Sequence, residues 1–550
     1  MEKIWLKQYE PGVPAEIDPD GFPSIVAMVM DSVARYGERP ADICAGIELS
    51  YRDLDRLSAG FAVWLQSSGL QQGARVALML PNILQFPVAF VGIVRAGMIA
   101  VGCNPLYTAR ELEHQLKDAG AEAMVVLDGL AAVHGELFSR LALHRVVLTA
   151  PTDQALLAAC AAGEPCAAAP APALGAGHTG LIDAIGAGMH AGPGEVDIEG
   201  GAIACLQYTG GTTGLSKGAM LTHRNLVTNV SQILAWWQPR LKQLQGKAAF
   251  ALGASPLYHA MGLVNFLSSI CSGRTVLLIP NPRDIAGLVK TLQKYPFNTV
   301  AASNSLLAAL LDNEAFRGLD FSSLLATTAG AMPTRREVAR KWHEVTGIPI
   351  AEAYGLSEAT MVATCNPLGI AEFNGTVGVP LPSAIVTIRN GDGVEVPLGE
   401  TGEVCIQGPQ VMKGYWQHPE ETARVMAADR ALRTGDIGRM DDRGYLTIVD
   451  RLKDMIIVSG FNVYPGEIET VIAAYPGVKE CAVIGVGDDK SGEVPKAFVV
   501  AANPQLTPAA IQDHCRRNLT GYKIPKYVEF IGELPKNNVG KVLRRALRKA

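Results

Sequence analysis

Short apolar runs alternate with amphipathic helical segments, and this alternation constrains the fold more than any other feature of the chain. Residues 75–80 (RVALML) and 123–127 (AMVVL) are apolar, and residues 109–119 (ARELEHQLKDA) place leucines opposite charged residues before Gly120. Continuous apolar runs are typical of strands buried on both faces, and glycine commonly ends a helix. The sequence therefore predicts an α/β fold with a largely parallel sheet covered by helices.

The alternation continues toward the carboxyl terminus. Further strands are predicted at 275–279, 299–303 and 324–329, with helices at 284–295, 305–311 and 335–345. Helices at 465–475 and 508–519 and strands at 482–486 and 497–501 predict a small α+β domain at the end of the chain. Because ligands bind beyond the carboxyl ends of strands in parallel sheets, the segments that follow the strands are the candidate site.

Composition excludes several classes of protein. The chain has 550 residues, 48% of them hydrophobic and 18% charged, which predicts a globular protein of more than one domain. A net charge of −5 gives no general attraction to nucleic acid. The ten cysteines include no CxxC pair, so we expect reduced thiols, a cytoplasmic location and no zinc site. Residues 90–102 are too few to span a bilayer, and any membrane contact would be peripheral.

Residues 207–220 (QYTGGTTGLSKGAM) have the composition of a phosphate-binding loop. The segment supplies three threonines, three glycines and a lysine: Thr209, Thr212, Thr213, Gly210, Gly211, Gly214 and Lys217. Glycines let backbone N–H groups approach a phosphate, hydroxyls can bind phosphate or a metal, and the lysine supplies positive charge. The Walker pattern is not met, because Lys217 lies between Ser216 and Gly218. The alternative is a flexible surface loop.

Other candidate residues follow predicted strands. Gly330 and Ala331 form a small-residue corner that suits an adenine ring, or any turn. An aromatic, a glycine, a hydroxyl and a carboxylate occur together at Tyr354, Gly355, Ser357 and Glu358. Magnesium prefers oxygen ligands, so Glu358 is a candidate ligand.

Three further residues have side chains suited to nucleotide or acyl binding. Asp436 could accept hydrogen bonds from ribose hydroxyls, and Arg451 follows another strand. His259 follows an apolar strand and could line an acyl pocket or could be a core histidine.

The order and spacing of these motifs resemble the adenylate-forming superfamily and, within it, the bacterial long-chain fatty acyl-CoA synthetases. The resemblance runs nearly end to end. It includes NPLYTARELEHQLKDAGA, the YTGG loop, PLYH, TGDIG, DRLKDMIIVSGFNVYPGEIE and LPKNNVGKVLRR. Ser216 and Ser357 depart from the proline and threonine common in the superfamily, and the Ala/Pro-rich residues 151–177 weigh against lipid docking.

The resemblance implies a role for each matching residue. Residues 209–214 and Lys217 would hold the ATP phosphates, with Thr213 and Glu358 at Mg²⁺ and Ser357 at a phosphate. Gly330, Ala331 and Tyr354 would frame adenine, Gly355 would belong to the same nucleotide site, and Asp436 and Arg451 would bind the ribose. Lys541 would stabilise charge that develops during adenylation.

The resemblance also implies two domains with a hinge at Lys453. A large multi-subdomain adenylation domain would span residues 1–450, a connecting segment 451–464, and a small mobile domain 465–550. Rotation of the small domain would remove Lys541 and bring Gly460 to a tunnel for CoA, so that both half-reactions share one pocket.

We therefore expect ATP-dependent activation of long-chain fatty acids to acyl-CoA through an acyl-adenylate, feeding fatty acid degradation. The substrates would be a fatty acid, ATP and CoA, with Mg²⁺ as cofactor. Alternatives are a fatty acyl-AMP ligase that loads a carrier protein, a medium-chain acyl-CoA synthetase, and a nucleotide- or lipid-binding protein without turnover. A homodimer and peripheral contact with the inner membrane stay open, and long-chain preference comes from the resemblance alone.

Overall fold

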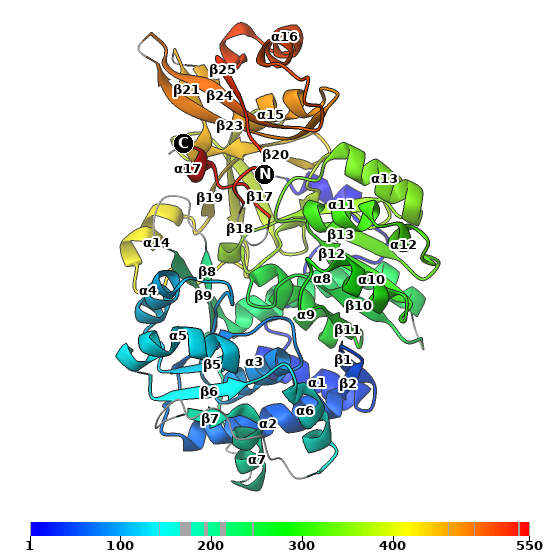
Figure 1. Cartoon of the computed structure of the whole chain (residues 1–550), viewed down its shortest axis with the longest axis vertical. Coiled ribbons are helices and arrows are strands. Elements are labelled where there is room, and N and C mark those ends of the chain that lie inside the picture. Colours follow the sequence, from blue (N-terminus) through cyan, green and yellow to red (C-terminus); the bar gives the residue numbers. More distant parts are fainter. Residues whose placement is uncertain are drawn as a thin grey trace. The chain divides into compact units, whose positions relative to one another are not determined.

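The computed structural model describes residues 2–141, 143–164, 178–191, 196–209, 216–244, 247–459, 461–488, 490–536 and 540–548 (Figure 1). The chain divides into two compact units. The larger unit comprises Gln8–Ile385 and Gln407–Leu432, and the smaller comprises Met1–Lys7, Val386–Ile406 and Arg433–Ala550. Each unit is described separately below.

A nine-stranded sheet forms one half of the larger unit. Its strands, in spatial order, are β16 (Val379–Pro380), β15 (Thr364–Cys365), β14 (Ile350–Tyr354), β13 (Ala326–Ala329), β12 (Phe297–Ala302), β10 (Phe250–Gly253), β11 (Thr275–Leu278), β1 (Pro40–Cys44) and β2 (Ile47–Ser50). All neighbours from β14 to β1 pair in parallel, and the edge strands β15, β16 and β2 pair antiparallel. The predicted parallel sheet is confirmed.

Helices cover both faces of this sheet. On one face, α10 (Ile285–Leu292), α11 (Asn304–Asp312) and α13 (Arg336–Thr346) contribute Leu288, Leu307 and Trp342 to a buried core against the strands. These helices lie beside β10 to β14 in green in Figure 1. The helices α8 (His223–Leu241) and α9 (Ala260–Cys271) pack against each other beside the same strands.

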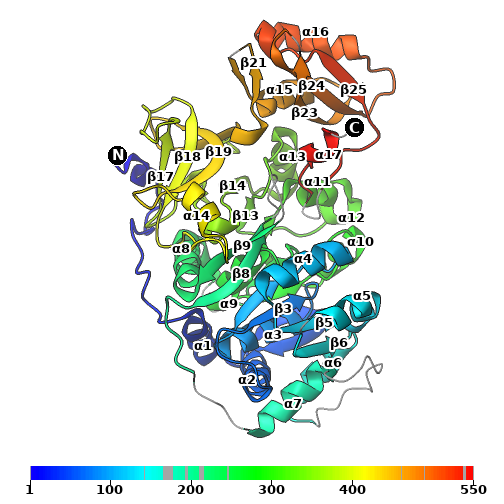
Figure 2. The same ribbon diagram turned by 90° about the vertical axis from the view of Figure 1, so that its left-hand side faces the viewer.

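A seven-stranded sheet forms the other half of the larger unit. Its order is β7 (His178–Gly180), β6 (Arg145–Thr149), β5 (Ala123–Leu127), β3 (Arg75–Met79), β4 (Ile99–Gly102), β8 (Ile203–Thr209) and β9 (Lys217–Thr222). Figure 2 shows α4 (Ala109–Ala119) and α5 (Asp128–Arg140) on one side and α2 (Tyr51–Ser67) and α7 (Leu181–Ala191) on the other. Helix α4 has the predicted bounds, with Gly120 in the left-handed region at its end.

The smaller unit contains two sheets. One has the order β17 (Ile385–Arg389), β18 (Gly402–Gln407), β19 (Leu432–Met440) and β20 (Leu446–Arg451). The other consists of β22 (Phe461–Val463), β21 (Ile456–Val458), β24 (Gly492–Ala501), β23 (Val478–Asp488) and β25 (Tyr527–Phe530). Helices α15 (Pro465–Ala473) and α16 (Pro508–Asn518) share a core with this second sheet, as the predicted α+β domain requires.

The cysteines follow the sequence-based expectation with one exception. Eight of those in the described part of the chain are free, and all of these except the half-buried Cys481 are buried. Cys160, near the end of α6 (Asp153–Ala161), is disulfide-bonded, so the expectation of a reduced thiol is wrong there. The lack of a CxxC pair does not exclude a disulfide, because bonding depends on the Cβ–Cβ distance in the fold. Among the described residues, no helix is both long and apolar enough to cross a membrane.

Candidate active site

The predicted phosphate loop connects two antiparallel strands. Thr209, the last residue of β8, lies opposite Lys217, the first residue of β9. Five of the predicted phosphate-binding residues lie outside the described part of the chain: Gly210, Gly211, Thr212, Thr213 and Gly214. Their roles, including that of Thr213 at a metal, stay predictions. The structure therefore positions the two ends of the loop.

Lys217 is held by a carboxylate and an aromatic ring. Its ammonium forms an ion pair with Glu421, on α14 (Pro419–Val425), and lies 5.2 Å from the centroid of the Tyr415 ring. The hydrogen bond from Lys217 lowers the pKa of Glu421. Cations are attracted to the faces of aromatic rings, so the ring and the carboxylate together hold the ammonium in place. A phosphate bound by Lys217 would compete with Glu421.

Tyr415 also contacts Glu358, in the 3₁₀ turn Ser357–Ala359. Its hydroxyl donates a hydrogen bond to Glu358 Oε1 at 2.8 Å. Burial and the charge of Glu358 raise the pKa of Tyr415, which keeps the phenol protonated as a donor. Tyr415 therefore lies between the lysine and the glutamate that were predicted to act on phosphate and metal.

Backbone bonds hold the Tyr415 segment against β9. Met220 N–H donates to Gly414 O at 2.8 Å, and Trp416 N–H donates to Gly218 O at 2.8 Å. Neither Tyr415 nor Glu421 was singled out from the sequence. They lie about two hundred residues from the loop, and nothing local marks a contact over that separation.

Tight turns follow β13 and β14. A Cβ atom on Gly355 would lie 1.7 Å from the carbonyl oxygen of Met361, and one on Gly330 would lie 3.2 Å from Ala353 O. Ala331 has a φ of 66°, a left-handed conformation that costs energy for a residue with a side chain. The loops predicted to frame adenine are thus closely packed against each other's backbone.

A buried glutamate that sequence reasoning missed supports these loops. Glu352, within β14, accepts a hydrogen bond from Thr334 N–H at 2.7 Å, and burial raises its pKa to about 7. Its backbone carbonyl accepts bonds from Asn366 N–H and the Asn366 side chain. The signal that could have identified it is a carboxylate inside an otherwise apolar strand.

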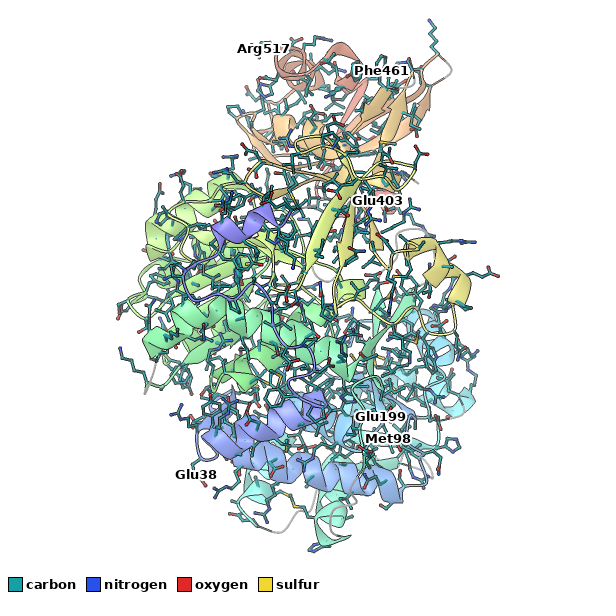
Figure 3. The ribbon with its side chains drawn as sticks, turned by 180° about the vertical axis from the view of Figure 1, so that it is seen from behind. Glu38, Met98, Glu199, Glu403, Phe461 and Arg517 are labelled. Carbon is teal, nitrogen blue, oxygen red and sulfur yellow. The ribbon has the colours of Figure 1, made fainter. Side chains whose placement is uncertain are left out.

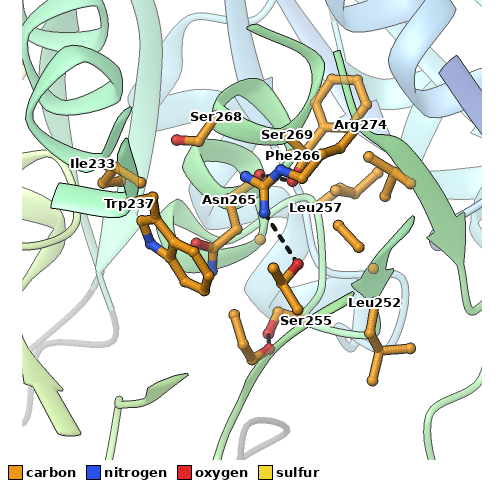
Figure 4. A pocket seen from close by; sticks show the side chains of 16 residues that line it. Ile233, Trp237, Leu252, Ser255, Leu257, Asn265, Phe266, Ser268, Ser269 and Arg274 are labelled. Atoms are coloured by element: carbon orange, nitrogen blue, oxygen red, sulfur yellow. Dashed lines mark hydrogen bonds between the residues drawn. The ribbon is translucent and has the colours of Figure 1, made fainter. Parts of the chain in front are cut away.

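A cavity lies between α8, α9 and the strands β10 to β12 (Figure 4). Its enclosed space is small, about 30 Å³, and reaches about 500 Å³ only when the open solvent beside the lining side chains is counted. Its lining is mostly apolar, with Ile233, Trp237, Leu252, Leu257, Phe266 and Val276 among the contributors. Polar groups come from serines, Asn265, Thr299 and Arg274. A mostly apolar cleft with a few polar groups is typical of a small-molecule site.

His259 lies at the amino end of α9, two residues after Leu257, which lines this cavity, but it is not itself a lining residue. Burial lowers the pKa of His259 to about 4, so its imidazole is neutral at pH 7. Its assignment to an acyl pocket stays a prediction.

The smaller unit brings together three other predicted site residues. Arg451 Nε donates to Asp436 Oδ1 at 2.8 Å, and Asp436 is only 3% exposed. Burial, followed by the charge of Arg451, lowers the pKa of Lys541 to about 8. The same two causes lower the pKa of the predicted hinge residue Lys453 to about 8. Lys541 therefore lies near the pair predicted to bind ribose.

The predicted CoA tunnel residue, Gly460, lies outside the described residues. The residues on either side of it are described. Ser459 has a φ of 48°, and the Phe461 side chain, labelled in Figure 3, is 55% exposed and stacks on Tyr522 at 4.7 Å. The role of Gly460 in a CoA tunnel stays a prediction.

Comparison with known sequences finds two family matches in this chain. Residues 29–416 match the AMP-binding enzyme family, and residues 467–541 match the AMP-binding enzyme C-terminal domain. The long-chain-fatty-acid–CoA ligase of Yersinia pestis is 48% identical, with coverage of 100% of this chain and 98% of that protein. The ligase of the same name from Bacillus subtilis is 35% identical over 99% and 98%.

Solved structures of related enzymes have the same fold as this chain. ATP-bound MatB from Rhodopseudomonas palustris matches with a TM-score of 0.83 at 29% identity, over 96% of this chain and 98% of that one. The anthranilate CoA ligase AuaEII, in complex with anthranoyl-AMP, shares the fold with a TM-score of 0.83 at 24% identity. The predicted fold class and the predicted resemblance are therefore confirmed, and the chain belongs to the AMP-binding enzyme family.

Proposed function

We propose that the protein is an AMP-forming ligase that converts a long-chain fatty acid, ATP and CoA into acyl-CoA, AMP and pyrophosphate. The observation that carries the proposal is the position of two features on one sheet. Tyr354 is the last residue of β14, Gly330 and Glu358 follow β13 and β14, and a mostly apolar cavity extends along β10 to β12. Likeness to long-chain-fatty-acid–CoA ligases along the whole chain supports this substrate class.

In the first half-reaction, a carboxylate oxygen of the fatty acid attacks the α-phosphorus of ATP. An O–P bond forms, the bond between the α-phosphorus and the bridging oxygen breaks, and pyrophosphate leaves. Lys217 would neutralise phosphate charge, and Gly330, Ala331 and Tyr354 would frame the adenine. Positioning and preorganised charge account for the catalysis, because no protein nucleophile is required.

Glu358 fits a Mg²⁺ ion that is shared with ATP. Magnesium is commonly bound by one or two carboxylates together with substrate phosphates. One Glu358 oxygen accepts a hydrogen bond from the Tyr415 hydroxyl, and this bond orients the carboxylate. No group of three or more His, Cys, Asp or Glu side chains suited to a metal occurs in the described part of the chain, so an all-protein metal cage is not formed there. When bound, Mg²⁺ would offset the charge of the phosphates.

The smaller domain is assigned two tasks. Lys541 would stabilise negative charge on the carboxylate, α-phosphate and pyrophosphate during adenylation. After movement about Lys453, the turn at Gly460 would admit CoA. The thiolate then attacks the acyl carbonyl carbon, a C–S bond forms, and the C–O bond to AMP breaks. Asp436 and Arg451 would hold the ribose in both steps.

Product analysis of the purified protein tests the proposal. With palmitate, ATP, Mg²⁺ and CoA, acyl-CoA and AMP should form in equal amounts. Without CoA, fatty-acid-dependent exchange of pyrophosphate into ATP should continue. Exchange without acyl-CoA at any chain length would favour a carrier-loading enzyme, and an optimum at medium chains would favour a medium-chain synthetase. Absence of both reactions would reject the proposal.

A cytoplasmic location, peripheral contact with the inner membrane and a homodimer belong to the same proposal. Cell fractionation in low and high salt would measure the membrane-bound fraction, because a peripheral electrostatic contact weakens with ionic strength. Analytical ultracentrifugation at several concentrations would measure the oligomeric state. A protein that sediments as a monomer throughout would exclude the dimer.

A further inference from the structure

An arginine lies deep in the apolar cavity. Arg274 is 4% exposed, although its guanidinium lines the cavity and extends beside Asn265 in Figure 4. Its Nη1 donates to Thr299 Oγ1 at 3.0 Å and its Nε donates to Ser272 Oγ at 2.9 Å. The guanidinium carbon lies 5.5 Å from the centroid of the Trp237 ring. The positive charge of Arg274 is therefore held in place by two hydroxyl groups and an aromatic ring, all of them neutral.

No carboxylate among the described residues forms an ion pair with Arg274. Another buried ionisable group in this sheet is Asp42, which pairs with Val276 in the β1–β11 register. Both Asp42 oxygens lack a hydrogen-bond partner, and burial raises the pKa of this carboxyl to about 8, so it is mostly neutral at pH 7. A buried cation without an anion is costly, and an anionic ligand would offset that cost.

Arg274 lies far from the edge of the sheet where adenylation is proposed. It immediately precedes β11, at the amino end of that strand, whereas Gly330 and Tyr354 lie at the carboxyl ends of β13 and β14, which are parallel strands of the same sheet. With about 3.3 Å per residue, the five residues from Arg274 to Ile279 span roughly 16 Å. An acyl chain whose carboxylate lies at the carboxyl edge would therefore bring its opposite end toward Arg274.

We propose that Arg274 is a specificity-determining residue that binds a carboxylate at the far end of the acyl chain, so that the protein activates α,ω-dicarboxylic acids. The inference rests on the proposed ligase function. A guanidinium offers a planar fork that can bind a carboxylate with two hydrogen bonds. Nη2 makes no hydrogen bond to any described residue, and the Nη1 bond to a neutral hydroxyl can be exchanged for a bond to the carboxylate.

A methyl-terminated fatty acid leaves the bonds to Thr299 and Ser272 unchanged and gains nothing from the charge. The enzyme would therefore use both classes of acid and favour the diacid at matched length. The distance from the carboxyl edge of the sheet to Arg274 follows from strand length, so the test covers acids of several chain lengths. The matched control for each diacid is its monomethyl ester, which has nearly the same shape but lacks the negative charge of the second carboxylate.

The experiment measures kcat/KM for hexadecanedioic acid, its monomethyl ester and hexadecanoic acid, and for shorter sets of the same three compounds. The variants are Arg274→Gln and the exposed control Arg110→Gln. Mass spectrometry would identify a mono-CoA thioester with a free carboxylate. For the best-fitting diacid, wild type should prefer the diacid over its ester by about ten- to hundredfold, the range expected for a charge-assisted hydrogen-bonded pair.

Arg274→Gln should raise KM for the diacid, so that its diacid-to-ester ratio of kcat/KM falls toward one, while Arg110→Gln should behave as wild type. A structural role would instead lower activity on all three compounds together. If Arg274→Gln does not fold, the comparison of diacid with ester in wild type decides the question. Equal or lower kcat/KM for every diacid, with hexadecanoic acid still activated, would overturn the inference alone. Activation of no acid would overturn the proposed ligase function as well.

Discussion

The substitution Gly355→Ala adds one methyl group at the most crowded point of the proposed nucleotide site. The new Cβ would lie 1.7 Å from Met361 O, so the two segments must separate by about 1.7 Å to regain an ordinary contact of 3.4 Å. Tyr354 and Glu358 flank this point and would move with it. A misplacement of about 1 Å can cost about a hundredfold in rate, which corresponds to about 2.7 kcal/mol.

Adenylation measured by pyrophosphate exchange should therefore fall by about a hundredfold or more in Gly355→Ala. Overpacking should also lower the free energy of unfolding by about 1–3 kcal/mol, measured by urea denaturation. The matched control is Gly135→Ala, in the interior of α5, where a Cβ meets nothing within 4 Å and helix propensity improves. Wild-type exchange in Gly355→Ala would refute the claim that this turn fixes the site.

Two other substitutions test the surroundings of Lys217 and Glu352. Glu421→Gln removes the ion pair that competes for Lys217, so KM for ATP should fall, while stability should change little because the pair is partly exposed. An unchanged KM would argue against phosphate binding by Lys217. The raised pKa of Glu352 means that the folded state holds this proton more tightly than the unfolded state. Its stabilising contribution is complete below about pH 4.5 and is lost as pH rises through about 7, a change of about 3 kcal/mol. Glu352→Gln should flatten the dependence of unfolding free energy on pH between about 5 and about 8, and an unaltered slope would show that another group causes it.

Local sequence patterns predicted much of the fold. The segment before Gly120 has strong helical periodicity and both capping signals, and its bounds are confirmed. Thr222 and Asn225 form a capping box at the start of α8. These signals act within a few residues, so a single sequence contains them.

Non-local contacts were not predictable in the same way. The four-stranded sheet β17 to β20 was not predicted, although a strand was expected before Arg451, because the pairing of these strands is a tertiary contact. The contacts of Tyr415 with Lys217 and Glu358 depend on the path of the whole chain. The importance of Arg274 appears only when β11 is placed beside β10, which itself pairs with β12. In each case the physical cause is tertiary packing, which local propensity does not encode.

The most direct test of the proposed mechanism is the adenylation rate of Lys541→Ala. Loss of one preorganised cation at the developing charge should lower fatty-acid-dependent pyrophosphate exchange by about 10²–10³-fold. Formation of acyl-CoA from added acyl-adenylate and CoA should be retained, and the exposed control Lys526→Ala should match wild type in both reactions. Undiminished exchange in Lys541→Ala would contradict the mechanism.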